Sequence, residues 1–185
     1  MTTILYLHEH GEISGGETSL LLLWQHLDRG SFRPVLLGPE SGPFIERARG
    51  LGVESRAASF LRFRDLAGRG GWRALGRLVG AARELDPAIL HGNTPHTNLA
   101  AAWIGRRLGR PCVWHERTLP HAREWDADRW LRALPDRIIC NSAAVAAQFR
   151  GRSRGKIQVI YNGIPEPAAW PGAEAAARAR FGLDG

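Results

Sequence analysis

The stretch TILYLHEHGEISGGETSLLLLWQHL, residues 3–27, decides the fold. Its first part, residues 3–8, is a short apolar run that predicts a buried strand, and residues 17–27 have the length and leucine content of a helix. A loop that contains Gly15 and Gly16 lies between them. A strand that leads through a glycine loop into a helix is typical of the first unit of an α/β fold.

The same alternation continues along the chain and predicts the architecture. Further strands are predicted over 33–38, 53–58, 88–91, 111–115, 136–140 and 157–160, and further helices over 43–51, 72–85, 97–108, 125–134, 142–149 and 171–183. Short strands between helices favour a doubly wound, mostly parallel, Rossmann-like sheet with helices on both faces and with the first and fourth strands near its centre. We expect residues 1–168 to form this domain and residues 169–185 to be a connector or the start of another domain.

The composition excludes several classes of protein. The 185 residues are 44% hydrophobic and 23% charged, as in an ordinary globular domain and unlike a disordered or collagenous chain. No stretch approaches the roughly 20 apolar residues of a membrane span, and the N-terminus turns polar after Leu7, unlike a signal peptide. Two cysteines, Cys112 and Cys140, are too few for a disulfide framework. We therefore expect a cytoplasmic protein with both thiols reduced and buried on neighbouring strands.

The formal net charge is +7, and Lys156 is the one lysine among the 25 cationic residues. The arginines are scattered, and no RNP-like, KH-like or zinc-knuckle motif accompanies them, so no nucleic-acid partner is predicted. Residues 56–83 raise a second hypothesis, a peripheral contact with the anionic inner face of a membrane. This stretch has a single acidic residue, Asp65, and its basic and aromatic residues are Arg56, Phe60, Arg62, Phe63, Arg64, Arg69, Trp72, Arg73, Arg77 and Arg83.

Polar residues follow four of the predicted strands at their carboxyl ends. They are residues 8–10 (HEH), 91–94 (HGNT), 115–118 (HERT) and 141–142 (NS). Ligands of doubly wound sheets bind outside these ends, so the four segments predict one shared cleft. Asn and Ser also cap helices, and Ser142 in particular is expected to be a cap.

The loop Ser14-Gly15-Gly16-Glu17 is the sharpest local feature. Glycines let a ligand approach the backbone, and the helix that follows presents free N–H groups and the positive end of its dipole to an anion. The loop matches neither GxGxxG nor GxxxxGK[ST], so the dinucleotide fingerprint and the P-loop are absent. A simple tight turn is the alternative, and a stand-alone module that binds a phosphate or a small molecule is a corresponding alternative function.

The pair His8 and His10 permits another interpretation, because an HxH pair at the end of a first strand can bind a metal. The chain is shorter than the roughly 250 residues of a usual barrel metallohydrolase. Downstream His and Asp residues show no clear ligand spacing. A metal-dependent hydrolase is therefore kept as a lesser alternative, and no metal or other cofactor is predicted.

Five stretches, taken in order, resemble the N-terminal half of glycosyltransferase family 4. They are ILYLHEHGEISGGETSLLLLWQHL (4–27), LLGPESGPFIERARGLGVE (36–54), LHGNTPHTNLAAAWIGRRLGRPCVWHERTLP (90–120), DRIICNSAAVAAQF (136–149) and VIYNGI (159–164). The resemblance implies a retaining enzyme of the GT-B fold, in which two Rossmann-like domains face each other across a cleft. It implies that this domain binds the acceptor, a sugar or a lipid-linked sugar, while the other domain binds the nucleotide-sugar donor.

The resemblance also implies roles for individual residues. Gly15 and Gly16 match the glycine loop beside the donor diphosphate, His115 matches the catalytic histidine beside the transferred sugar, and residues 162–163 match a motif before the interdomain connector. Acceptor contacts are expected from the cleft rim, at Glu9, Asn93, His96, Glu116 and Arg117. The family's donor domain, with its Arg/Lys pair and paired glutamates, does not follow within these residues. It would belong to a longer protein or to a separate chain, so we expect this chain alone to be inactive.

Overall fold

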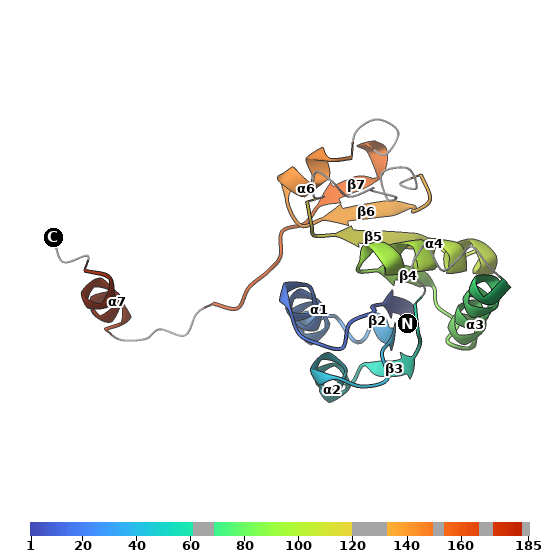
Figure 1. The fold of residues 1–185 in the computed structure, drawn as a ribbon, viewed down its shortest axis with the longest axis horizontal. Coiled ribbons are helices and arrows are strands. Elements are labelled where there is room, and N and C mark those ends of the chain that lie inside the picture. Colours follow the sequence, from blue (N-terminus) through green and yellow to red (C-terminus); the bar gives the residue numbers. More distant parts are fainter. Residues whose placement is uncertain (61–68, 120–132, 150–153, 167–171, 183–185) are drawn as a thin grey trace.

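The computed structural model describes residues 1–60, 69–119, 133–149, 154–166 and 172–182 (Figure 1). They form one seven-stranded parallel sheet in the order β3-β2-β1-β4-β5-β6-β7, which confirms the doubly wound α/β fold. The strands are β1 (Thr2–Leu7), β2 (Phe32–Gly38), β3 (Glu54–Ala57), β4 (Ile89–Gly92), β5 (Cys112–Glu116), β6 (Arg137–Cys140) and β7 (Ile157–Val159). The helices are α1 (Gly15–His26), α2 (Pro43–Gly50), α3 (Arg69–Glu84), α4 (Pro95–Leu108), α6 (Ala143–Ala147) and α7 (Ala173–Phe181), with a 3-10 turn η2 at Arg154–Lys156.

Alternate residues of the central strands pack into opposite layers. Leu5 and Leu7 of β1 belong to the core beneath α3 and α4, where Leu90 of β4 joins them. Tyr6 of β1 belongs to the other core, beneath α1 and α2, and its ring meets the edge of the Trp24 ring at a centroid distance of 5.3 Å. Both faces of the sheet are therefore covered, as Figure 1 shows, and this explains why the strands are almost continuously apolar.

The position of β1 determines where a ligand can bind. β1 pairs with β2 on one side and with β4 on the other. The strand order thus reverses between β1 and β4, and doubly wound sheets bind ligands outside the carboxyl ends of the strands at such a point. The prediction that the first and fourth strands lie together near the centre of the sheet is confirmed.

Capping residues, and not the apolar pattern, decide where the helices begin. α1 begins two residues earlier than predicted, directly after its N-cap Ser14, and α4 also begins two residues earlier, directly after Thr94, whose hydroxyl accepts from the N–H of Thr97 at 3.3 Å. α3 begins three residues earlier than predicted. The predicted cap Ser142 is confirmed, since its hydroxyl accepts from the N–H of Val145 at 3.1 Å. The helix predicted over 125–134 falls mostly outside the described residues.

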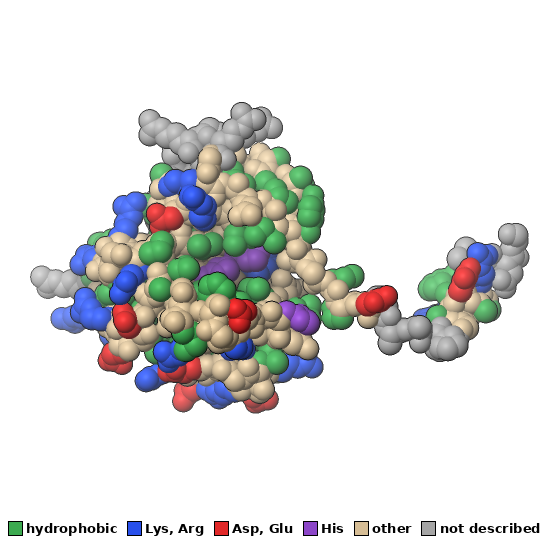
Figure 2. Space-filling model, turned by 180° about the vertical axis from the view of Figure 1, so that it is seen from behind, with side chains coloured by type: hydrophobic (Ala, Val, Ile, Leu, Met, Phe, Trp, Pro, Cys, Tyr) green, Lys and Arg blue, Asp and Glu red, His purple; other side chains and the backbone are tan. Residues whose placement is uncertain are grey.

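The charged side chains do not gather in one block on the face shown in Figure 2, where basic and acidic groups are interspersed. α7 has no buried residue and lies away from the sheet in Figure 1. The domain boundary at residue 168 stays a prediction. Within the described part of the chain, no helix is long and apolar enough to cross a membrane.

Cys112 and Cys140 lie on the neighbouring strands β5 and β6, and both are buried, as predicted. Cys140 pairs in register with Glu116, four residues along β5 from Cys112. At about 3.3 Å per residue the Cα atoms of the two cysteines are offset by about 13 Å along the strands, well beyond the roughly 7 Å that a disulfide allows, so the two cannot form a disulfide with each other.

We expect neither thiol to react with a disulfide reagent in the native protein, even at pH 9. Burial, together with nearby carboxylates, raises the pKa of Cys112 to about 12 and that of Cys140 to about 11, so both remain protonated and shielded. The measurement is the rate of absorbance change with Ellman's reagent, with the protein in denaturant as the positive control. Rapid labelling of either thiol without denaturant would contradict the buried positions.

Candidate functional site

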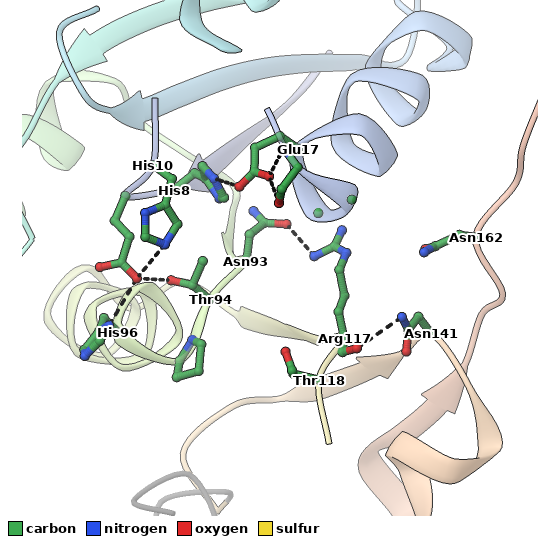
Figure 3. A pocket seen from close by; sticks show the side chains of 15 residues that line it. His8, His10, Glu17, Asn93, Thr94, His96, Arg117, Thr118, Asn141 and Asn162 are labelled. Carbon is green, nitrogen blue, oxygen red and sulfur yellow. Dashed lines mark hydrogen bonds and ion pairs between the residues drawn. The ribbon is translucent and has the colours of Figure 1, made fainter. Parts of the chain in front are cut away.

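A cavity of about 940 Å³ lies at the carboxyl ends of β1, β4 and β5 (Figure 3). Its described lining is made by residues 8–10, 14–17, 93–96, 117–118, 141 and 162. The four polar segments that the sequence places after strands therefore meet around one cavity. Of the predicted site residues, Glu9, Gly15, Gly16, Asn93, His96 and Arg117 lie on its wall.

The first turn of α1 forms one side of the cavity. The first backbone hydrogen bond of this helix runs from the N–H of Thr18 to the carbonyl of Ser14 at 3.0 Å, so the three N–H groups before Thr18 have no carbonyl partner within the helix. The N–H of Glu17 meets the Ser14 side chain in a capping box, which leaves those of Gly15 and Gly16. A Cβ atom added to Gly15 would meet nothing within 4 Å, and one added to Gly16 would lie 3.9 Å from the Arg117 side chain. Free N–H groups at an open helix N-terminus are suited to bind an anion.

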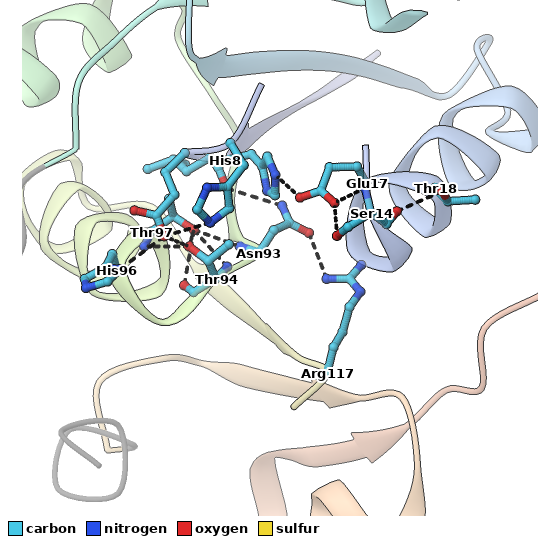
Figure 4. A network of polar contacts seen from close by, with 12 residues as sticks. His8, Ser14, Glu17, Thr18, Asn93, Thr94, His96, Thr97 and Arg117 are labelled. Atoms are coloured by element: carbon cyan, nitrogen blue, oxygen red, sulfur yellow. Dashed lines mark hydrogen bonds and ion pairs between the residues drawn. The ribbon is translucent and has the colours of Figure 1, made fainter. Parts of the chain in front are cut away.

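A buried pair fixes this turn to the end of β1 (Figure 4). Nε2 of His8 lies 2.6 Å from Oε1 of Glu17, and the backbone N–H and the hydroxyl of Ser14 donate to Oε2 at 2.8 and 2.5 Å. Burial lowers the pKa of His8, although Glu17 opposes that shift. Burial also raises the pKa of Glu17, but the hydrogen bonds, chiefly from Ser14, outweigh it and leave the pKa below its usual value. Both pKa values are therefore lowered, which is consistent with a neutral His8 imidazole that donates a hydrogen bond to an ionised Glu17 carboxylate.

Sequence reasoning missed the His8–Glu17 pair, because it considered Glu17 only as part of the loop that leads into the first helix. The two residues are nine positions apart, and no local pattern joins them. The sequence does hold one indication of this pair. His8 directly follows the apolar residues of a buried strand, and a buried imidazole needs a hydrogen-bond partner.

Arg117 enters the cavity from the end of β5. Its Nη1 donates to Oδ1 of Asn93 at 3.3 Å, whereas its buried Nε and Nη2 have no hydrogen-bond partner in the described structure. Burial lowers the pKa of Arg117 to about 10, against the opposing effect of Glu17 and Glu116. The guanidinium therefore remains positively charged at neutral pH.

Glu9 lines the cavity beside Thr94 and His96 at the start of α4, and Figure 3 shows these two side chains across the cavity from Arg117. Oε1 of Glu9 accepts from the hydroxyl of Thr94 at 2.9 Å and lies 3.1 Å from Nδ1 of His96. Nε2 of His10 lies 3.6 Å from the same oxygen. These contacts hold the carboxylate in place, and side chains of this kind are suited to bind hydroxyl groups.

Two predicted site residues, His115 and Glu116, are not among the lining residues. Both are buried and belong to β5, which continues to Glu116, one residue beyond its predicted end. The His115 ring stacks on His91 at a centroid distance of 5.5 Å, and burial, helped by the charge of Arg117, lowers its pKa to about 2. Glu116 accepts from Nδ2 of Asn98 at 2.6 Å. Both residues therefore lie behind the wall of the cavity, and the roles that the sequence assigns to them stay predictions.

The predicted pair His8 and His10 is not free to act as a metal site on its own. Nε2 of His8 is held by Glu17, and the two imidazole rings lie edge to face at a centroid distance of 5.7 Å. Across the described ranges, no group of three or more His, Cys, Asp or Glu side chains could hold a metal ion.

Comparison with known proteins identifies the family. The sequence model of Glycosyltransferase Family 4 matches residues 13–166, which is most of the chain. The chain belongs to glycosyltransferase family 4. No curated protein sequence matches it at a significant level.

Solved structures of GT-B glycosyltransferases share the fold of this family 4 domain. The Anabaena protein HepE, in complex with UDP and glucose, has a TM-score of 0.70 and 19% identity over 99% of this chain and 51% of its own. A glycosyltransferase from Rickettsia africae has a TM-score of 0.69 and 10% identity over 100% and 50%, respectively. The lipopolysaccharide outer core galactosyltransferase WaaB has a TM-score of 0.63 and 13% identity over 91% of this chain and 47% of its own. The chain thus spans about half the length of these proteins and corresponds to the N-terminal domain of the GT-B fold.

Proposed function

We propose that this chain is the acceptor-binding domain of a retaining glycosyltransferase, which transfers a sugar from a nucleotide-sugar donor to a sugar or a lipid-linked acceptor. The observation that carries the proposal is the cavity, with the open N-terminus of α1 on one side and the Glu9 carboxylate, held by Thr94 and His96, on the other, in a chain of family 4. The HepE structures contain UDP, UDP-glucose, or UDP and glucose, which supports a nucleotide-sugar donor.

The two sides of the cavity suit the two substrates. Transfer creates negative charge on the departing nucleoside diphosphate, and the free N–H groups of Gly15 and Gly16 would stabilise it. On the other side, Oε1 of Glu9 is already held by the contacts with Thr94 and His96, while its Oε2 has no partner among the described residues and is free to accept from an acceptor hydroxyl. His115, whose imidazole is neutral at physiological pH, keeps its proposed role beside the transferred sugar, although it lies behind the wall of the cavity.

The domain organisation of the proposal places residues 1–168 in the acceptor domain and residues 169–185 in the connector to a donor domain. The segment that leads to this connector contacts α1, because the hydroxyl of Ser19 donates to Oδ1 of Asn162 at 3.0 Å. The test is a transfer assay with a panel of nucleotide sugars, in which the chain is joined to a family 4 donor domain. No product from any donor and acceptor pair under these conditions would contradict the proposed function.

In the same proposal the protein is cytoplasmic and contacts the inner face of a membrane through residues 56–83. Part of this stretch, including Arg62, Phe63 and Arg64, lies outside the described residues. On α3, Arg73 and Arg77 are exposed, and the Trp72 side chain is 57% exposed. Trp72 packs beside Trp103 of α4 at a centroid distance of 5.3 Å, so an aromatic surface lies next to these cations.

We expect the chain to co-sediment with vesicles that contain phosphatidylserine, and the double substitution Arg73→Ser and Arg77→Ser to weaken this binding about 30-fold. Each cation near an anionic surface contributes about 1 kcal/mol, so two contribute about 2 kcal/mol. The matched control replaces two exposed arginines elsewhere, Arg47→Ser and Arg137→Ser, and should change binding much less. If the unchanged chain does not bind these vesicles, the membrane contact is wrong.

A further inference from the structure

Arg117 is a cation on the wall of the cavity that has no paired carboxylate in the part of the chain that the structure describes. Among the described lining residues it is the one Lys or Arg. No carboxylate in the described structure lies within ion-pair distance of its guanidinium, and Nε and Nη2 have no hydrogen-bond partner. The Arg117 side chain is half-buried, but its Nε and Nη2 are buried with no hydrogen-bond partner or paired carboxylate among the described residues, which is costly, so its position indicates that an anion from outside the chain completes the site.

The nearest carboxylates are already engaged with other groups. Both oxygens of Glu17 are taken, Oε1 by His8 and Oε2 by Ser14, and Glu116 accepts from Asn98. These carboxylates keep the guanidinium charged through their field, but they leave its free N–H groups unbonded.

The free donors of Arg117 lie beside those of the helix turn. The Arg117 side chain reaches from β5 toward the first turn of α1, as Figure 4 shows, and its Cδ lies 3.9 Å from the place of a Cβ on Gly16. A guanidinium binds phosphate oxygens through two parallel N–H groups, and a helix N-terminus binds them through backbone N–H groups. The two donor sets are thus arranged to bind neighbouring oxygens of one phosphate or diphosphate group.

We propose that Arg117 and the N–H groups of Gly15 and Gly16 together bind the diphosphate of the nucleotide-sugar donor. The inference rests on the proposed function and differs from one expectation of the sequence analysis, which assigned Arg117 to the acceptor. The acceptor side is instead the wall formed by Glu9 and His96, which carries no Lys or Arg among the described lining residues. A phosphate group on a lipid-linked acceptor offers the same chemistry, so the experiment separates the two sources.

The experiment is an NMR titration of the 185-residue chain with UDP, uridine and pyrophosphate. We expect UDP and pyrophosphate to shift the amide signals of Gly15 and Gly16, with dissociation constants in the millimolar range, and uridine to leave them in place. Arg117→Gln should raise the dissociation constants of UDP and pyrophosphate about tenfold or more, as is typical for a lost hydrogen bond to a charged group. Arg117→Lys, which keeps the charge but loses the planar fork, should give an intermediate loss.

The matched control is Arg110→Gln, which removes the same charge just before β5, at the end of the strand opposite to the cavity. It should change both dissociation constants by less than about twofold, since an exposed charge this distant is screened. The unchanged amide spectrum away from the cavity reports that each variant is folded. If Arg117→Gln does not fold, the Arg117→Lys variant decides the question, because it must still bind more weakly than the native chain.

The outcomes separate this inference from the proposed function. Equal binding of UDP and pyrophosphate by native chain and Arg117 variants, with Gly15 and Gly16 still shifting, would overturn the role of Arg117 and leave the proposed function intact. Binding of pyrophosphate without binding of UDP would assign the site to an acceptor phosphate and would also overturn the inference. If neither compound shifts these two amides in the native chain, the donor side of the proposed function is wrong as well.

Discussion

The 185-residue chain by itself should transfer no sugar at a measurable rate, and joining it to a donor-binding domain should restore transfer. Holding two substrates in one reactive geometry supplies about 7–11 kcal/mol of barrier reduction, but only when both are bound. The chain spans about half the length of the GT-B enzymes that share its fold, and its cavity lies on one of the two walls of the proposed cleft. Without the second wall, neither the donor base nor the exclusion of water is provided.

The same reasoning sets the expected affinity of the isolated chain for a donor. A contact with one helix N-terminus contributes about 0.3–1 kcal/mol, and a charge-assisted hydrogen bond about 1.5–3 kcal/mol. Their sum does not exceed the roughly 4.1 kcal/mol of a millimolar complex. Calorimetry with a panel of nucleotide sugars measures this, alongside the transfer assay with and without the donor domain. Micromolar donor binding or turnover by the chain alone would favour a stand-alone binding module and contradict an active site between two domains.

The fold could be predicted from the sequence because each strand is a short apolar run with breakers on both sides. Burial on both faces of the sheet makes the runs continuous, and helices between them leave a doubly wound topology as the simplest arrangement. The helix starts were less accurate, since caps such as Ser14 and Thr94 decide them through single hydrogen bonds. An apolar pattern carries no information about these bonds.

The candidate site could be predicted in outline only. The strand ends identified the rim segments, but each residue's depth depends on where its strand stops. β5 runs one residue beyond its predicted end, so Glu116 belongs to the strand beside His115 and neither residue lines the cavity, while Arg117 does. The pairs His8–Glu17 and Asn98–Glu116 join different elements, nine and 18 residues apart. Contacts of this kind follow from the packing of helix on sheet, and no local pattern in the sequence encodes them.

Gly92→Ala should destabilise the protein by about 3 kcal/mol, at the upper end of what overpacking usually costs. Gly92 ends β4 directly beneath α4, and a Cβ there would lie 2.6 Å from the Cα and 2.8 Å from the N of Asn98. These are backbone atoms, so a change of rotamer cannot relieve the contact, and α4 must move away from the sheet. For a chain of this size the melting temperature should fall by about 6–12 °C, at about 2–4 °C per kcal/mol.

The control for this prediction is Gly76→Ala in α3, where an added Cβ meets nothing within 4 Å. The same change at an open helical position should stabilise the protein by about 0.5–1 kcal/mol, because alanine restricts the unfolded chain. Urea unfolding with an unchanged slope measures both effects. Equal stability of Gly92→Ala and the native chain would contradict the close approach of α4 to β4. That approach also supports the cavity, since Asn98 holds Glu116 and the Thr97 hydroxyl accepts from the N–H of Asn93 at 3.1 Å. Displacing α4 should therefore weaken pyrophosphate binding together with the fold.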